Sequence, residues 1–191
     1  VLTSGKAYSN VFHANGGSAA FSVMANTLRG VYGTDVLLAT ANSFTGSVLQ
    51  ADYNQKMAAS MIMPNGLMSR QRTMTGAELK ETVRAFVEGC EGGFVPFNRG
   101  SLPVVSGIAV EVKEAGGSYT LTGITRNGQP LRDDDTVTVT CLATEKQMAA
   151  LPASESGTSA GEDTWVKNTW CDHVSGGGAA LAEPENYMTL R

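Results

Sequence analysis

Histidine and cysteine are both scarce in this chain. Its 191 residues include two histidines, His13 and His173, which stand far apart in the sequence. A hydrolytic metal centre normally combines several imidazole and carboxylate ligands, so this supply is too small to build one. The three cysteines, Cys90, Cys141 and Cys171, are widely separated and show no C-x-x-C spacing. We therefore expect packed thiols rather than a disulfide framework, and no catalytic metal site within this chain.

Excess positive charge and long apolar runs are also missing. The net charge is −4 and the pI is near 5.2, with Lys and Arg scattered through the chain, which argues against nucleic acid or an anionic membrane surface as a partner. No apolar run approaches the roughly 20 residues of a membrane span. The start, VLTSGKAYSN, has neither an initiator Met nor signal-peptide regions. We expect a mature product or a piece of a longer protein.

Several familiar catalytic motifs are absent. There is no P-loop, no dinucleotide-binding glycine pattern and no G-x-S-x-G elbow. In the cluster 171–173, a helix would turn about 100° from each residue to the next, so the side chains of Cys171 and His173 would face away from each other. A packed thiol is therefore favoured over an activated nucleophile. The carboxylate run 133–135 follows a turn and is expected to be a solvated loop. Arg70 and Arg72 alternate along an expected strand and are interpreted as solvated.

The strongest secondary-structure signal lies in MTGAELKETVRAFVEG, residues 74–89, which predicts an amphipathic helix over 75–88. Thr75 and Glu78 have the spacing of a capping box, in which each side chain satisfies a free backbone N–H at the helix start. Gly89 can supply the residue that ends the helix. The expected buried face consists of Leu79, Val83, Phe86 and Val87.

The remaining patterns predict one α+β domain with a mixed, largely antiparallel sheet and covering helices. We divide the chain into an N-terminal arm or linker, residues 1–17, and a domain, residues 18–191. A helix over 21–32 closed by Gly33 leads into an apolar run, 35–41, that is typical of a strand buried on both faces. Further strands are expected at 67–73, 104–112, 117–124, 136–142 and in the C-terminal NYMTLR, with a turn at Asn127-Gly128 and a short helix in DTWVKNTWCDHV.

Three strings that follow one another in the sequence resemble the C-terminal domain of the 5′-nucleotidase family. They are TMTGAELKETVRAFVEG, SLPVVSGIAVEV and ITRNGQPLRDDDTVTVTCLAT. The family has, in the same order, a Leu/Met-Thr-Gly-x-x-Leu helix start, a Val-Ser-Gly strand, and an Asn-Gly-x-Pro-Leu turn before a Thr-Val strand. Upstream, residues 25–42 are similar to the family's helix and apolar strand, and MPNG at 63–66 is similar to its Leu-Pro-Phe turn. The resemblance covers roughly residues 18–191.

This resemblance implies a division of labour between two domains. In the family, a separate N-terminal metallophosphoesterase domain holds divalent metal ions and performs hydrolysis, while the C-terminal domain supplies the nucleotide pocket. We therefore expect this chain to have no cofactor of its own and to bind a nucleotide or nucleoside. Its partner would be a covalently linked metallophosphoesterase domain that lies outside this chain. Family members usually act outside the cytoplasm, so the resemblance implies an extracytoplasmic, bacterial setting.

The nucleotide-binding positions depart from the family pattern. The Asn-Gly-Gly-Gly-Ile-Arg loop of the family appears here as NSFTGSV, which keeps Asn42 without the following arginine. The two regions that carry base-stacking rings in the family read SLPVV and ATEKQMAALPAS, without an aromatic residue. Phe97 and Arg99 lie in the loop just before SLPVVSG, and an arginine beside an aromatic ring can bind a base or a phosphate. The candidate substrate-binding residues are therefore Asn42, Phe97 and Arg99.

Purely structural roles for these residues, without ligand binding, stay open. Asn42 can bond its own loop backbone, and loop aromatics commonly fold back onto the core. The leading hypothesis is a substrate-recognition domain of a 5′-nucleotidase-like phosphohydrolase, inactive in hydrolysis by itself. The alternative is a degenerate, non-catalytic family member that binds another ligand or a surface partner.

Overall fold

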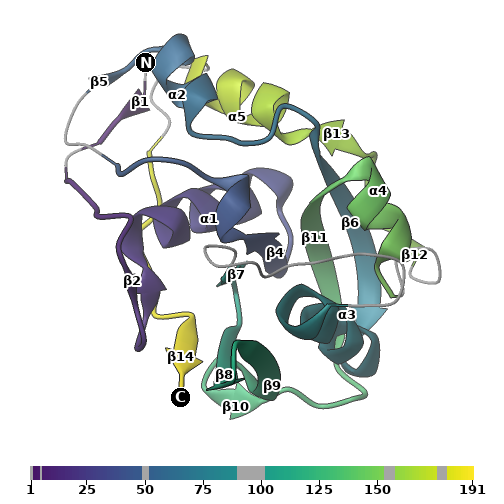
Figure 1. The fold of residues 1–191 in the computed structure, drawn as a ribbon. Helices are drawn as coiled ribbons and strands as arrows, with labels where there is room; N and C mark the ends of the chain where they lie inside the picture. Colours follow the sequence, from purple (N-terminus) through teal and green to yellow (C-terminus); the bar gives the residue numbers. More distant parts are fainter. Residues whose placement is uncertain (1, 5, 49–51, 90–101, 153–157, 176–179) are drawn as a thin grey trace.

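The computed structural model of the chain describes residues 2–4, 6–48, 52–89, 102–152, 158–175 and 180–191 (Figure 1). One sheet has the strand order β12-β6-β11-β4-β7, with β13 also paired to β6, and a second has the order β10-β9-β8-β14. The first sheet contains β4 (Val36–Thr40), β6 (Leu67–Thr75), β7 (Pro103–Ser106), β11 (Thr136–Thr144), β12 (Thr158–Ser159) and β13 (Thr164–Trp165). The second contains β8 (Ala109–Ala115), β9 (Ser118–Arg126), β10 (Gln129–Pro130) and β14 (Met188–Leu190).

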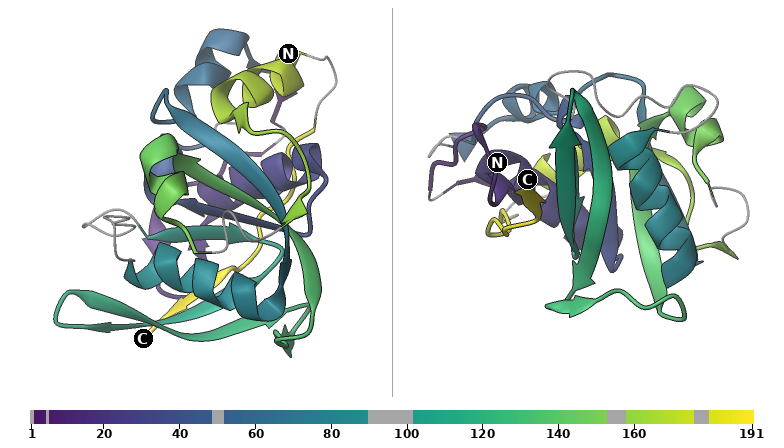
Figure 2. Two further views of the ribbon diagram at one scale, coloured as in Figure 1. Left: turned by 90° about the vertical axis from the view of Figure 1, so that its right-hand side faces the viewer. Right: turned by 60° about the horizontal axis from the view of Figure 1, so that its bottom comes forward.

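Helices cover both sheets. They are α1 (Ala19–Tyr32), α2 (Gln55–Ser60), α3 (Gly76–Glu88), α4 (Glu145–Ala150) and α5 (Val166–Ser175), with a short 3₁₀ turn η1 (Ala41–Ser43). Helix α3 contacts strands of both sheets and lies between them (Figure 2). Among the described residues, no helix is long and apolar enough to span a bilayer. The expected α+β class, with mostly antiparallel pairing, is confirmed; the parallel pairs are β11 with β4 and β14 with β8.

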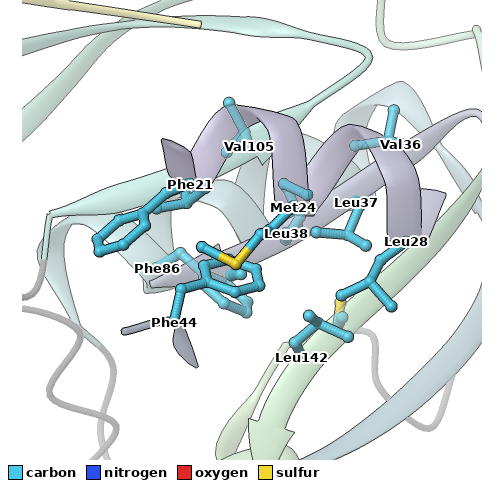
Figure 3. Packing of buried hydrophobic residues seen from close by; sticks show 14 of the residues in the cluster. Phe21, Met24, Leu28, Val36, Leu37, Leu38, Phe44, Phe86, Val105 and Leu142 are labelled. Atoms are coloured by element: carbon cyan, nitrogen blue, oxygen red, sulfur yellow. The ribbon is translucent and has the colours of Figure 1, made fainter. Parts of the chain in front are cut away.

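Strand β4 forms the centre of the core. Val36, Leu37, Leu38 and Ala39 are all fully buried, as the unbroken apolar run predicted. Strand β11 pairs with β4 in parallel on one side and β7 pairs with it antiparallel on the other. Helices α1 and α3 both pack against β4, and Figure 3 shows side chains of α1, β4, α3 and β11 meeting around it. Both faces and both edges of this strand are therefore covered.

Helix α1 ends where the sequence predicted, but it begins at Ala19, two residues before the predicted start, and it is buried on more than one face. Ser18 caps its start by accepting a hydrogen bond from Phe21 N at 3.3 Å, and Gly33 ends it with φ +65°. Its buried residues are Ala20, Phe21, Ser22, Val23, Met24, Ala25, Asn26, Thr27 and Leu28. The polar members bind the backbone of an extended C-terminal segment: Asn26 Nδ2 donates to Glu183 O at 2.8 Å, and Thr27 Oγ1 accepts from Ala182 N at 2.9 Å.

The N-terminal residues that we assigned to an arm or linker contact the rest of the domain at several points. Lys6 Nζ lies 2.8 Å from Glu183 Oε1, and Tyr8 exchanges backbone hydrogen bonds with Val48. Two short strand pairs add to these contacts, β1 (Leu2–Thr3) with β5 (Asp52–Tyr53) and β2 (Phe12–His13) with β3 (Gly17–Ser18). The described part of residues 1–17 therefore packs along the domain and against its C-terminal segment.

The capping box of α3 is present as predicted. Thr75 Oγ1 accepts from Glu78 N at 3.2 Å, and Glu78 Oε2 accepts from Thr75 N at 2.8 Å. A loop that carries the carboxylate run closes over the same helix end: Gly76 N donates to Asp135 O at 2.7 Å and Ala77 N donates to Asp133 O at 3.2 Å. The free N–H groups of the first turn are thus satisfied by side chain and loop together.

The predicted single strand 104–112 is wrong, because it is two strands in two different sheets. β7 ends at Ser106 and β8 begins at Ala109, with Gly107 between them at φ +82°. A Cβ atom on Gly107 would lie 2.0 Å from Asp35 O, so the chain passes this point against another backbone and changes direction. The apolar/polar alternation runs through the break, which is why the sequence pattern did not reveal it.

Asp35, the residue before β4, ties the two sheets together. Its Oδ2 accepts from Thr138 N at 2.8 Å and from Thr138 Oγ1 at 2.9 Å, and its Oδ1 pairs with Arg126 Nη2 at 2.8 Å. Burial raises the pKa of the Asp35 carboxyl, but the Thr138 hydrogen bonds and the charges of Arg126 and Arg29 outweigh burial. The pKa therefore lies below its ordinary value, and the carboxylate form is the stabilised one.

We expect Gly76→Ala to destabilise the domain by about 2–3 kcal/mol. A Cβ at this position would lie 1.8 Å from Arg132 O, so the loop that caps α3 must move away and its hydrogen bonds weaken. Gly30→Ala is the matched control, because nothing lies within 4 Å of its added Cβ, and it should be neutral or stabilising by up to about 1 kcal/mol. Urea denaturation measures both, and equal stability of the two variants would contradict the close contact.

We expect Asp35→Asn to lower the free energy of unfolding at pH 7 by roughly 1 kcal/mol, a modest value because the ion pair is partly exposed and screened. A carboxyl whose folded pKa is depressed contributes stability above its unfolded pKa and loses that contribution as pH falls through the folded pKa. The difference between wild type and variant should therefore shrink in the acid range, below the ordinary aspartate pKa. Denaturation curves across that range measure it; a constant difference would contradict the depressed pKa.

Candidate functional site

One edge of the first sheet gathers loops from distant parts of the chain. Because β4, β11 and β13 run in the same direction and β6 and β7 run against them, the ends of the first three meet the beginnings of the other two. We call this the Asn42 edge and define it by Asn42, Asn65, Trp165 and Lys167. It is the edge at which the candidate residue Asn42 lies, directly after β4.

Asn42 is exposed on the 3₁₀ turn η1, and the backbone around it is held from three sides. Ala41 N donates to Leu102 O at 2.8 Å and Ser43 O accepts from Met63 N at 3.0 Å. Within the turn, Thr40 N donates to Ser43 Oγ at 3.4 Å. The structure therefore fixes the position from which the Asn42 side chain projects.

Trp165, at the end of β13, is the large aromatic residue of this edge. It is 48% exposed, which is a high value for a Trp. Trp165 lies opposite Met68 on β6, and Met68 lies opposite Ala143 on β11. Ala143 stands two residues after Cys141, which pairs with Leu38 of β4. Trp165 and the end of β4 are thus level with each other, three strand spacings or roughly 14 Å apart.

Asn65 and Lys167 connect the turn before β6 to the start of α5. Lys167 Nζ donates a hydrogen bond to Asn65 Oδ1. Lys167 also lines a cavity of about 520 Å³ between α2 and α5, together with Lys56, Cys171 and Asp172. The neighbouring Met63 is 46% exposed. Amide, ammonium and apolar groups are therefore available within a short stretch of this edge.

Arg70 and Arg72 hold the segment that carries Trp165, so the prediction that they are solvated is wrong. Arg70 Nε lies 3.0 Å from Asp163 Oδ2, and Arg72 Nη1 lies 4.0 Å from Asp163 Oδ1. The two arginine side chains are 20% and 16% exposed. Their charges are directed to Asp163, two residues before Trp165, and fix where the indole stands.

The structure describes one of the three predicted site residues. Phe97 and Arg99 lie outside the described residues and stay predictions. Sequence reasoning missed Trp165, although a signal was available: Val166, Trp170 and Val174 recur at helical spacing and are buried, and Trp165 lies off that face. Asn65 and Lys167 gave no local signal, because their contact joins residues 102 positions apart.

The two cysteines within the described residues, Cys141 and Cys171, and His173 show no sign of catalytic activation. Burial raises the pKa of Cys141 to about 12 and also raises the pKa of Cys171, which keeps both thiols protonated and unreactive. The His173 ring lies 6.3 Å from that of Trp170, between ring centroids. Over the described ranges, no three His, Cys, Asp or Glu residues are placed to hold a metal ion.

Comparison with known proteins identifies the fold. No protein-family model and no curated protein sequence matches this chain. Among solved structures, the 5′-nucleotidase precursor of Thermus thermophilus is similar over 100% of this chain and 39% of its own, with a TM-score of 0.66 and 12% identity. The NAD nucleotidase of Haemophilus influenzae is similar over 100% of this chain and 38% of its own, with a TM-score of 0.64 and 17% identity.

A third similar structure is the sulfate thiohydrolase SoxB of Thermus thermophilus, which matches 91% of this chain and 32% of its own, with a TM-score of 0.61 and 13% identity. This chain thus spans between a third and two fifths of the proteins that it resembles. The expected fold is confirmed: the chain has the fold of the C-terminal domain of 5′-nucleotidases.

We expect Asp163→Asn to loosen the Trp165 segment, because it removes the carboxylate that pairs with Arg70 and Arg72. Acrylamide quenching of Trp165 fluorescence should rise, and stability should fall by about 1 kcal/mol, since the side chains are only partly exposed. Trp170 is fully buried and contributes little to quenching. Glu162→Gln is the matched control: this exposed neighbour forms no ion pair with the described residues and should leave quenching unchanged. Equal quenching in both variants would contradict the view that the ion pairs of Asp163 hold the Trp165 segment in place.

Proposed function

Because the chain has the fold of the C-terminal domain of 5′-nucleotidases, we propose that it is the substrate-recognition domain of a nucleotidase-like phosphohydrolase. Its ligand would be a nucleoside or a nucleoside monophosphate. The observation that carries the proposal is the likeness along the whole chain to two proteins whose names are 5′-nucleotidase precursor and NAD nucleotidase.

The Asn42 edge supports a nucleoside ligand. An exposed indole such as Trp165 offers a flat surface for base stacking, which is worth about 1–3 kcal/mol per base in nucleic-acid complexes. The Asn42 side chain can donate and accept hydrogen bonds from a fixed position at the same edge. In this proposal Trp165 takes over from the rings missing in SLPVV and ATEKQMAALPAS, and Phe97 and Arg99 contribute further contacts to base and phosphate.

Hydrolysis is assigned to a different domain. The proposed partner is a covalently linked metallophosphoesterase domain that supplies the divalent ions, as the family resemblance implies. The isolated chain would then bind substrate without releasing phosphate, and we infer an extracytoplasmic, bacterial location for the complete protein.

We expect adenosine and AMP to bind the isolated chain saturably and to quench Trp165 fluorescence. Trp165→Ala should weaken binding by about tenfold or more, because losing about 1.4 kcal/mol of stacking equals a factor of ten. Trp165→Phe keeps a ring and should lose less. Asn42→Ala, Phe97→Ala and Arg99→Ala should each weaken binding, and Arg99→Ala should reduce AMP affinity more than adenosine affinity if Arg99 contacts the phosphate. Titration calorimetry provides the affinities.

Asn186→Ala is the matched control for Asn42→Ala. Asn186 is also exposed but lies near the opposite end of β4, beside the Arg29 cavity, and its change should leave nucleoside affinity unaltered. Absence of heat and of quenching with every nucleoside and monophosphate would overturn the proposal. Phosphate release from AMP by residues 1–191 with divalent ions, abolished by chelation, would overturn the division of labour.

A further inference from the structure

A polar cavity lies at the other end of β4, away from Asn42. Its volume is about 410 Å³, within the usual range of small-molecule pockets. It forms where the chain passes between the two sheets, at Gly107 to Ala109 and at the Asn127–Gly128 turn. Its charged lining residues are Arg29, Asp35, Arg126 and Glu185.

Arg126 and Asp35 neutralise each other. Arg126 Nη2 lies 2.8 Å from Asp35 Oδ1, and the other oxygen of Asp35 already accepts two hydrogen bonds from Thr138. The carboxylate of Asp35 is therefore fully committed within the fold. It orients the Arg126 guanidinium.

Arg29 is the second cation of the cavity; its charge acts on the Asp35 carboxylate at longer range and helps to lower the pKa of that carboxyl, but its hydrogen bonds do not go to that carboxylate. Its Nε donates to Ser106 Oγ at 2.7 Å and its Nη1 donates to Asp35 O at 3.4 Å, and both acceptors are uncharged groups. Among the described residues it forms no ion pair, and its Nη2 has no hydrogen-bond acceptor. A half-buried guanidinium with an unused donor beside a cavity is suited to binding an anion.

The position of Arg29 is fixed before any ligand arrives. Ser106, which accepts from Arg29, is fully buried and donates to Asn26 Oδ1, and Asn26 in turn binds Glu183 O at 2.8 Å. A Cβ on Gly107 would lie 3.3 Å from Arg29 Cδ, so the glycine leaves room for the side chain to cross it. Such outside support lowers the cost of ordering the site on binding.

We propose that this cavity binds a compact carboxylate ligand with a single negative charge, and that Arg29 pairs with the carboxylate. The charge follows from how the lining is paired: Arg126 is in an ion pair with Asp35, Arg29 forms none within the described part of the chain, and the exposed carboxylate of Glu185 disfavours a second negative charge on the ligand. Glu185 instead favours a ligand that carries a cationic or donor group at its other end, as an α-amino acid does. This inference does not depend on the proposed nucleotide function, because it uses none of the residues of the Asn42 edge.

The probes are acetate, glycine and inorganic phosphate, titrated into the ¹⁵N-labelled chain at constant ionic strength. We expect acetate and glycine to shift the amide signals of residues 107–109 and 125–128 saturably, with glycine at least as tight as acetate and phosphate weaker than both. Arg29→Gln should weaken acetate binding by about tenfold or more, because it removes the charged fork. Arg84→Gln is the matched control, since Arg84 lies on α3 and pairs with Glu88 at 4.0 Å, and it should bind acetate as the wild type does.

Glu185→Gln tests the same cavity with a change that should not disturb folding, in case Arg29→Gln does. The Glu185 side chain is exposed and forms no hydrogen bond with the described residues, so the change should preserve the fold and tighten acetate binding about two- to threefold by removing the opposing charge. Three outcomes would overturn the proposal: no saturable shift at the cavity, acetate affinity unchanged by both Arg29→Gln and Glu185→Gln, or phosphate binding tighter than acetate.

Discussion

Burial of strand β4 on both faces, from Val36 to Ala39, is the constraint on which the rest of this structure depends. A strand with no exposed face must satisfy every backbone group through its neighbours, and β11 and β7 do so from either side. Polar and ligand-accessible groups can then appear only where the strand ends. Asp35 stands at its beginning and Asn42 just after its end, and the Arg29 cavity and the Asn42 edge lie at these same two points.

Two close backbone approaches constrain this fold at glycine positions. Gly76 meets Arg132 O at the start of α3, and Gly107 meets Asp35 O where the chain changes sheets. Any side chain at either glycine would separate the two segments that touch there. Both glycines lie inside strings that carry the family resemblance, Thr-Gly at 75–76 and Val-Ser-Gly at 105–107. In this chain, each of these two strings therefore contains a glycine at a contact between two backbones.

Local patterns predicted the elements whose causes are local. The capping box of α3, the glycine that ends α1 and the apolar run of β4 each act within a few residues, and all three are found where the sequence placed them. The sheet change at Gly107 was missed because alternation continues through it. The hydrogen bonds of the polar α1 residues and the ion pairs of Asp163 were missed because they join residues about 90 to 160 positions apart. The candidate site was therefore only partly predictable: Asn42 follows a strand, whereas Trp165 gains its place from remote contacts.

The two ends of β4 differ in how their charges are used, and this difference separates their ligands. Near the Asn42 edge, three cations of the described residues are already engaged, Arg70 and Arg72 with Asp163, and Lys167 with Asn65. The described part of that edge therefore offers a stacking surface and amide groups, which suit the nucleoside part of the proposed ligand. At the opposite end, the Asp35 carboxylate is bound by Thr138 and Arg126, and Nη2 of Arg29 has no hydrogen-bond acceptor among the described residues. In the two proposals, a carboxylate ligand that depends on ionic pairing is consequently assigned to the Arg29 cavity, and a ligand that depends on ring stacking to the Asn42 edge.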